Sequence, residues 1–263
     1  MASLPRPESR DDFKVAIICA LPREFDAVTL LFDEFWDEDD DSYGRAPGDT
    51  NTYTTGRIGK LDVVLVVLPN MGNNSAAAAA ASFRSSYGSL KLALLVGVCG
   101  GVPIIEKDEV LLGDVVISKT LIQYDFGRQF LGTFVAKTTV EDSLGRANRD
   151  IRGLVASLES EHGRERLQDK AARHLRSLQS AAVRKRRRAN YCDPGPTTDK
   201  LFASDYAHRH QKTCDLCATE GTSYCEGAAH ASCAELGCDE SKLVSRKRLQ
   251  VEEAMAGDGT RSP

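Results

Sequence analysis

The sequence lacks long apolar runs and any excess of positive charge. No run reaches the roughly 18 apolar residues of a membrane span, and residues 1–10 lack the apolar core of a secretory signal. The formal net charge is -4, which disfavours a nucleic-acid-binding protein. The 8 cysteines among 263 residues are too sparse for a small disulfide scaffold. These absences predict a soluble cytoplasmic protein with reduced thiols, no membrane partner and no direct nucleic-acid binding.

Strand and helix patterns alternate through the first half of the chain. Short apolar runs of the kind found in buried strands occur at residues 13–20, 61–68, 92–96 and 115–117. Residues 53–57 and 61–68, joined by a Gly-Lys turn, predict a β-hairpin. Pro22 suits the first position of a helix, and Asn73 or Asn74 could cap an alanine-rich helix. The alternation predicts an α/β fold with a largely parallel sheet.

Composition divides the chain into three parts. Residues 1–12 are polar and predict a disordered tail. Residues 13–183 carry the α/β pattern and end in a predicted amphipathic helix, residues 151–183, that packs on the sheet. Residues 184–263 begin with basic residues, contain Cys and His, and predict an insertion or an irregular tail.

Glu24 is the first candidate for a functional residue. It ends the stretch Ala20-Leu21-Pro22-Arg23-Glu24, which follows the first predicted strand. Open α/β sheets bind ligands beyond the carboxyl ends of their strands, where a carboxylate can act as a general base or orient a water molecule. The alternative, favoured by position alone, is an acidic residue that complements the dipole of the helix.

Two glycine-containing turns are the next candidates. Gly72 precedes the alanine-rich helix, where backbone N–H groups can approach an anion or a sugar hydroxyl; a plain turn is the alternative. Three glycines occur in Gly97-Val98-Cys99-Gly100-Gly101, which predicts either close backbone approach to a ligand or a tight bend. This spacing differs from the dinucleotide fingerprint and from the phosphate-binding P-loop.

As an ordered set, these stretches resemble the purine nucleoside phosphorylase and uridine phosphorylase superfamily. The likeness is strongest to its nucleosidase branch, which cleaves methylthioadenosine and adenosylhomocysteine. In detail, the motif sequences are similar to those of fungal members, which often precede a NACHT domain or helical repeats in signalling proteins. Gly113-Asp114-Val115-Val116 is similar to a further family strand. The resemblance implies a three-layer α/β/α sandwich with a mixed, largely parallel sheet of the phosphorylase/hydrolase-like kind.

The resemblance also implies roles for these residues. Glu24 would position the water or the ribose, and no redox cofactor is implied. The sugar pocket would be lined by Gly72, Val98, Cys99, Gly100 and Gly101. The expected partner is a small-molecule purine nucleoside whose N-glycosidic bond is cleaved. A homo-oligomer is also compatible with the family, because its members often complete the pocket from a neighbouring subunit.

Three departures from the family pattern bear on activity. Leu95 and Val98 stand where phosphorylases hold phosphate with polar groups, so hydrolysis by water is favoured over phosphorolysis. The late Glu that grips the ribose and the late Asp that protonates the purine have no match after residue 120. The chain also stops where fungal members return to the core, so the domain is expected to be incomplete at its C-terminus and poorly active alone. The alternative function is a non-catalytic nucleoside-sensing or protein-interaction domain of a fungal signalling protein.

The basic run and the cysteines of the last third carry weaker hypotheses. Either a nuclear-localisation signal or a solvated helix end would explain the basic run Arg184, Lys185, Arg186, Arg187 and Arg188.

Cys214 and Cys217 have the spacing of half a zinc site, but the other cysteines are not closely paired. We therefore assign no metal; the zinc candidates are Cys214, Cys217, Cys225 and Cys233, and the alternative is reduced thiols. Cys19 and Cys99 lie in apolar runs and predict buried thiols.

Overall fold

A computed structural model describes residues 5–36, 43–105, 107–137, 139, 146–189, 191–211, 214, 217 and 225–257. The chain forms two compact units. The first comprises residues 1–100 and 118–192, and the second comprises residues 101–117 and 193–263. These units differ from the predicted domain boundaries: residues 101–117 belong to the second unit, and residues 184–192 belong to the first.

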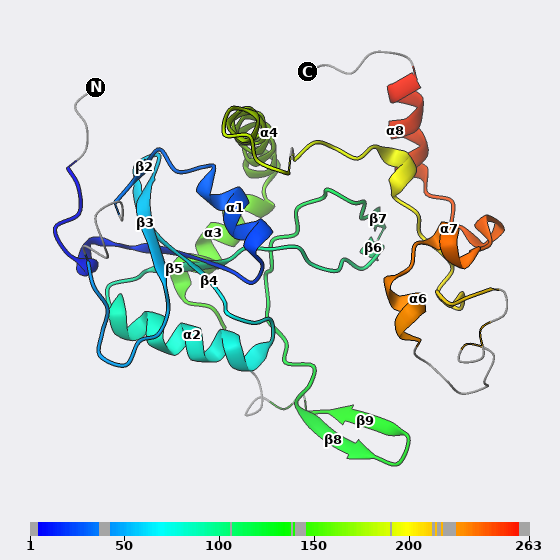
Figure 1. Cartoon of the computed structure of the whole chain (residues 1–263), viewed down its shortest axis with the longest axis horizontal. Helices are drawn as coiled ribbons and strands as arrows, with labels where there is room; N and C mark the ends of the chain where they lie inside the picture. Colours follow the sequence, from blue (N-terminus) through cyan, green and yellow to red (C-terminus); the bar gives the residue numbers. More distant parts are fainter. Residues whose placement is uncertain are drawn as a thin grey trace. The chain divides into compact units, whose positions relative to one another are not determined.

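A five-stranded mixed sheet organises the first unit (Figure 1), in the order β2-β3-β4-β1-β5. Its strands are β1 (Val15–Cys19), β2 (Glu34–Phe35), β3 (Tyr53–Ile58), β4 (Leu61–Val67) and β5 (Leu92–Leu95). β1 pairs in parallel with both β4 and β5. β3 pairs antiparallel with β4 and forms the predicted hairpin, in which Tyr53 lies opposite Val66.

Helices cover both faces of this sheet, which gives the predicted three-layer α/β/α arrangement. Because side chains alternate between the faces of a strand, Val63 and Leu65 of β4 pack with Val28 of helix α1 (Pro22–Thr29). Val64 and Val66 point to the other face, where they pack with Phe83 of α2 (Asn73–Ser86). Burying both faces explains why β4 reads as a continuous apolar run rather than an alternating one.

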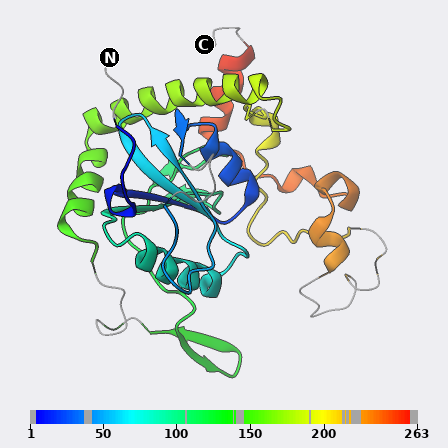
Figure 2. The same cartoon turned by 60° about the vertical axis from the view of Figure 1, so that its left-hand side comes forward.

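The predicted helix 151–183 is instead two helices, α3 (Arg149–Glu159) and α4 (Glu161–Arg184). They meet in a sharp bend (Figure 2). Ser160 is extended there, with φ -71° and ψ 152°, and its hydroxyl accepts the N–H of Gly163 and so caps α4. The predicted packing on the sheet is also wrong: buried Leu178, Ala181 and Ala182 pack against Leu30, just after α1.

Two further predictions differ from the structure. Residues 5–12, predicted as a disordered tail, include a 3-10 turn at Arg10–Asp12, and the Arg57 guanidinium donates to the carbonyl of Pro5 at 2.6 Å. Residues 1–4 lie outside the described residues. The strand predicted at residues 115–117 does not form; of the nearby residues, β8 (Gly127–Phe130) and β9 (Thr133–Ala136) form a separate hairpin.

The second unit consists of short elements around few buried side chains. The hairpin strands β6 (Ile104–Ile105) and β7 (Asp108–Glu109) precede the helices α6 (Glu226–His230), α7 (Cys233–Leu236) and α8 (Lys247–Gly257). The Glu109 carboxylate accepts the backbone N–H groups of Lys247 and Arg248 at 3.0 and 2.7 Å and caps α8. Among its described residues, the buried side chains are Leu111, Ala228, Leu236 and Arg246.

Candidate functional site

The three predicted ligand-binding stretches follow three neighbouring parallel strands. Residues 20–24 follow β1, residues 68–72 follow β4, and residues 96–100 follow β5. β4, β1 and β5 are adjacent and run in the same direction. Their carboxyl ends, and the loops that leave them, therefore lie at one edge of the sheet, which is where open α/β sheets bind ligands. Gly101, the last predicted residue, is the first residue of the second unit.

Glu24 joins two of these loops through its side chain. One carboxylate oxygen, Oε2, accepts the backbone N–H groups of Ala20 and Leu21, both at 2.9 Å. The other, Oε1, accepts the N–H of Val98 at 2.8 Å. Glu24 is only 8% exposed, so these bonds offset the cost of burying a carboxylate. Glu24 thus caps α1 and also holds the loop after β5.

Gly97 allows this contact because it has no side chain. A Cβ atom at this position would lie 2.5 Å from Oε1 of Glu24, closer than van der Waals contact allows. Glycine is therefore required by the approach of the buried carboxylate. The sequence motif contains Gly97, but it does not reveal the reason for the glycine, because Glu24 and Val98 lie 74 positions apart in the chain.

The remainder of the loop faces solvent in this structure. Val98 is 83% exposed, and Cys99, Gly100 and Gly101 are also exposed. The prediction that Cys99 is a buried thiol is therefore wrong. Cys19 is fully buried as predicted; burial, together with the negative charge of Glu24, raises the pKa of its thiol to about 11. Cys19 is a core residue rather than a nucleophile.

Gly72 begins helix α2 at the end of the β4 loop. Its backbone has φ 116° and ψ 161°, a conformation that favours glycine. Gly72 is itself the N-terminal cap, so the prediction that Asn73 or Asn74 caps the helix is wrong. Asn73 is the first helical residue, and its side-chain amide donates to Asp125 at 3.0 Å.

A groove of about 320 Å³ lies along the start of α2. Its walls come from the loop before β3, the loop after β4 and one face of α2. The lining residues are Thr50, Asn51, Pro69, Asn74, Ser75, Ala78, Ala79 and Ser82. Five of these eight residues carry a hydroxyl or an amide group, but most of the exposed lining surface is apolar. Glu24 does not line it.

Part of the predicted basic run contacts the first unit itself. The guanidinium of Arg187 lies 3.5 Å from the carboxylate of Asp26 in α1, and the ammonium group of Lys185 lies over the ring of Phe35 at 5.7 Å. Arg184 is the last residue of α4. These contacts are consistent with a basic helix end. They do not test nuclear targeting, which stays a prediction.

The second unit brings Cys and His side chains together in two clusters. His210, Cys214, Cys217 and Cys225 place their possible ligand atoms within 4.8 Å of one another, as do His208, Cys233 and Cys238. Three of the zinc candidates predicted from the sequence, Cys214, Cys217 and Cys225, lie in the first cluster. The fourth candidate, Cys233, lies in the second cluster, and the sequence did not distinguish the two clusters. Either cluster could hold a metal ion, since thiolate and imidazole are the ligands that zinc prefers.

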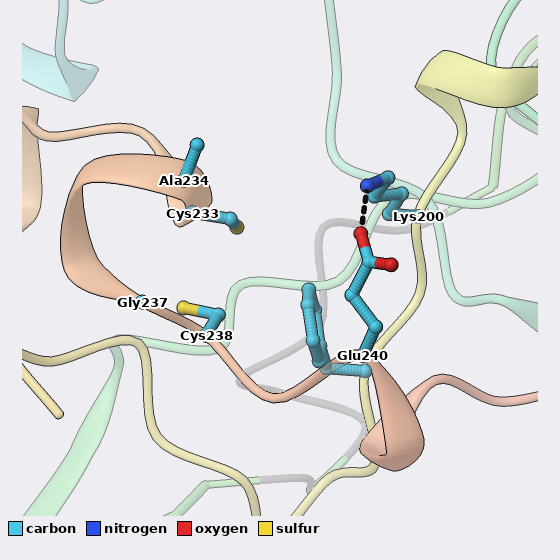
Figure 3. A pocket seen from close by; sticks show the side chains of 7 residues that line it. Lys200, Cys233, Ala234, Gly237, Cys238 and Glu240 are labelled. Carbon is cyan, nitrogen blue, oxygen red and sulfur yellow. Dashed lines mark hydrogen bonds and ion pairs between the residues drawn. The ribbon is translucent and has the colours of Figure 1, made fainter.

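The second cluster borders a cavity of about 190 Å³. Figure 3 shows Cys233 and Cys238 on one side of it and the ion pair between Lys200 and Glu240 on the other. Burial, together with the neighbouring thiol of Cys233, raises the pKa of Cys238.

Comparison with known proteins agrees with the three-layer fold. The sequence profile of the Phosphorylase superfamily matches residues 14–226. The chain therefore belongs to the Phosphorylase superfamily, as its motifs indicated.

One relative, from the fungus Hyaloscypha variabilis, has the name "Nucleotide-binding leucine-rich repeat (NLR)-like protein". It is 33% identical over 130 residues, which cover 47% of this chain and 13% of the relative. The chain thus matches a small part of a much longer protein. No solved structure matches the chain. No described helix is both long and apolar enough to cross a membrane.

Proposed function

We propose that the first unit binds a purine nucleoside at the carboxyl ends of β4, β1 and β5 and belongs to a domain that cleaves the N-glycosidic bond with water. The observation that carries this proposal is the contact between Glu24 and Val98, which ties the loop after β5 to the loop after β1. A fixed loop of backbone N–H groups at this edge is suited to hold the sugar of a nucleoside.

Glu24 serves this site in two ways. Its three backbone hydrogen bonds fix the loops, which makes it a positioning residue. A carboxylate offers about four acceptor positions, so one remains beyond the three that described N–H groups occupy. That position can orient one water molecule or one ribose hydroxyl.

Hydrolysis is favoured over phosphorolysis because the loop offers few donors for a phosphate. Leu95 and Val98 have apolar side chains, and the N–H of Val98 already donates to Glu24. A phosphate dianion that leaves water needs several hydrogen-bond donors or cations around it. A water molecule needs far fewer partners.

A second candidate is a domain that binds a nucleoside without cleaving it. Cleavage requires a proton for the departing base and stabilisation of the ribosyl cation, and the sequence shows neither of the family's late acidic motifs. The NLR-like name of the relative also fits a sensing role in a larger signalling protein.

Binding and turnover of methylthioadenosine and adenosine distinguish these candidates. We expect calorimetry to detect binding to the wild-type chain, with release of adenine that is slow and independent of added phosphate. Glu24→Gln should reduce binding and release at least tenfold, because an amide cannot accept all three N–H bonds. Glu165→Gln, on the exposed surface of α4, should match the wild type.

A circular dichroism spectrum of Glu24→Gln distinguishes a loss of binding from a loss of folding. Binding with no adenine release selects the non-catalytic candidate. Release that depends on phosphate would contradict hydrolysis, and a folded Glu24→Gln variant with wild-type binding would contradict the proposed site.

A further inference from the structure

The described residues of the second unit form too small an apolar core to explain its fold. Its described residues bury three apolar side chains, Leu111, Ala228 and Leu236. The buried Arg246 is held by polar contacts, including one to the carbonyl of Asp199 at 3.0 Å. Units with so little buried apolar surface usually need disulfides or a metal ion for stability. The eight cysteines form no disulfide in the structure.

We propose that zinc ions supply the missing stability, one in each Cys/His cluster of the second unit. Both zinc sites belong to the second unit, and the inference is independent of the proposed function of the first unit. The first ion would be held by His210, Cys214, Cys217 and Cys225, a complete set of three thiolates and one imidazole. A closed set of four such ligands is typical of a structural zinc site.

The distances in the first cluster match those of a tetrahedral zinc site. Zinc bonds of about 2.3 Å to sulfur and about 2.0 Å to nitrogen place a ligating sulfur and nitrogen about 3.5 Å apart. Nδ1 of His210 lies 3.4 Å from Sγ of Cys217 and 3.9 Å from Sγ of Cys225. All four possible ligand atoms lie within 4.8 Å of one another, close enough to bind one ion together.

A hydrogen bond of His208 independently supports the second ion. Nε2 of His208 lies 3.1 Å from the carbonyl of Ala231. Because a carbonyl oxygen only accepts hydrogen bonds, Nε2 is the donor, and the neutral form of the ring then offers the electron pair of Nδ1 to a metal ion. Metal-binding histidines usually fix their second nitrogen in this way. Nδ1 lies 3.8 Å from Sγ of Cys233 and 3.9 Å from Sγ of Cys238.

The backbone around helix α7 places these two thiols together. Ser232 caps the helix in a reciprocal arrangement with Glu235, and Gly237 ends it in the left-handed conformation. The N–H of Cys238 then donates to the carbonyl of Cys233 at 3.0 Å. This turn places the Sγ atoms of Cys233 and Cys238 close to Nδ1 of His208. Three protein ligands leave one coordination position for water beside the cavity of Figure 3.

Elemental analysis of the whole chain, purified under reducing conditions from medium with zinc, tests the proposal. We expect two zinc ions per chain. Cys217→Ser should lose one ion from the first cluster, and Cys238→Ser should lose one from the second. Cys99→Ser, a change at an exposed cysteine of the first unit, should retain both.

Two measurements guard against a variant that simply fails to fold. Cys217→His keeps a zinc ligand at the same position and should retain the first ion. Cobalt added to the metal-free chain should give the absorption bands of a tetrahedral thiolate site, weakened by Cys217→Ser. A wild-type chain without zinc overturns the proposal, and full zinc in Cys217→Ser or in Cys238→Ser overturns the site to which that residue belongs.

Discussion

Gly97 and Glu24 show how one pair of residues can shape a site. The carboxylate of Glu24 occupies the space that a side chain at residue 97 would fill. This close approach lets Glu24 reach the N–H of Val98. The glycine is therefore required by packing, even though the residues after it are exposed.

The substitution Gly97→Ala tests this requirement. Its Cβ would overlap Oε1 of Glu24, whose carboxylate is already fixed by Ala20 and Leu21. We expect a loss of about 1–3 kcal/mol in the free energy of unfolding, measured with urea. Gly100→Ala is the matched control, because a Cβ there meets no atom within 4 Å. An equal loss in both variants would contradict the prediction.

Single residues were the hardest part to predict from the sequence. By position alone, Glu24 is predicted to complement the dipole of helix α1, and the structure adds that its carboxylate accepts the N–H groups of Ala20 and Leu21 at the start of that helix. Its second contact, with Val98, depends on the pairing of β1 with β5 and has no local signal. The same reason explains why His210 could not be assigned to Cys217 from spacing.

Among the elements, β3 and α2 are joined by the carboxylate of Asp49. Oδ2 of Asp49 accepts the hydroxyl of Tyr53 at 2.6 Å and also that of Ser86, and Oδ1 accepts the N–H of Asn51 at 2.8 Å. Partial burial alone would raise the pKa of Asp49, but the hydrogen bonds from Ser86 and Tyr53 outweigh it and lower the pKa. The ionised form therefore stabilises the fold.

This lowered pKa predicts a loss of stability in acid. The contribution of Asp49 is complete above its unfolded pKa of about 3.9 and disappears as the pH falls through the lower folded value. Asp49→Asn should cost about 1–2 kcal/mol at pH 7, and the difference from the wild type should shrink below about pH 4. Thermal melts across this pH range measure it. Asp169→Asn, exposed on α4, should show neither effect, and a constant difference at all pH values would contradict the prediction.

Elements with strong local patterns could be predicted well. The apolar run of β1, the β3–β4 hairpin and Pro22 at the start of α1 all form as expected. Residues 115–117 are as apolar as a strand but pair with no strand among the described residues, because strand formation needs a partner that a local pattern cannot supply. The break at Ser160 was missed because the helical spacing continues across it.

At the scale of the whole molecule, β5 forms one of the two edges of the five-stranded sheet. β5 pairs with β1 on one side, and no described strand pairs with its other side. Leu95 at its end is 73% exposed, contrary to the prediction of a buried strand. Unpaired strand edges with apolar side chains promote association between molecules.

This edge predicts that the isolated chain self-associates as its concentration rises. Leu95→Lys should weaken the association, because a charge on an edge strand opposes pairing with a second copy. Val183→Lys is a matched control, since Val183 lies on α4 and is also 73% exposed. Sedimentation velocity over a range of concentrations measures the effect. The β5 edge would be excluded as the contact if the chain stayed monomeric, or if both substitutions reduced association equally, because general apolar exposure would then explain the behaviour.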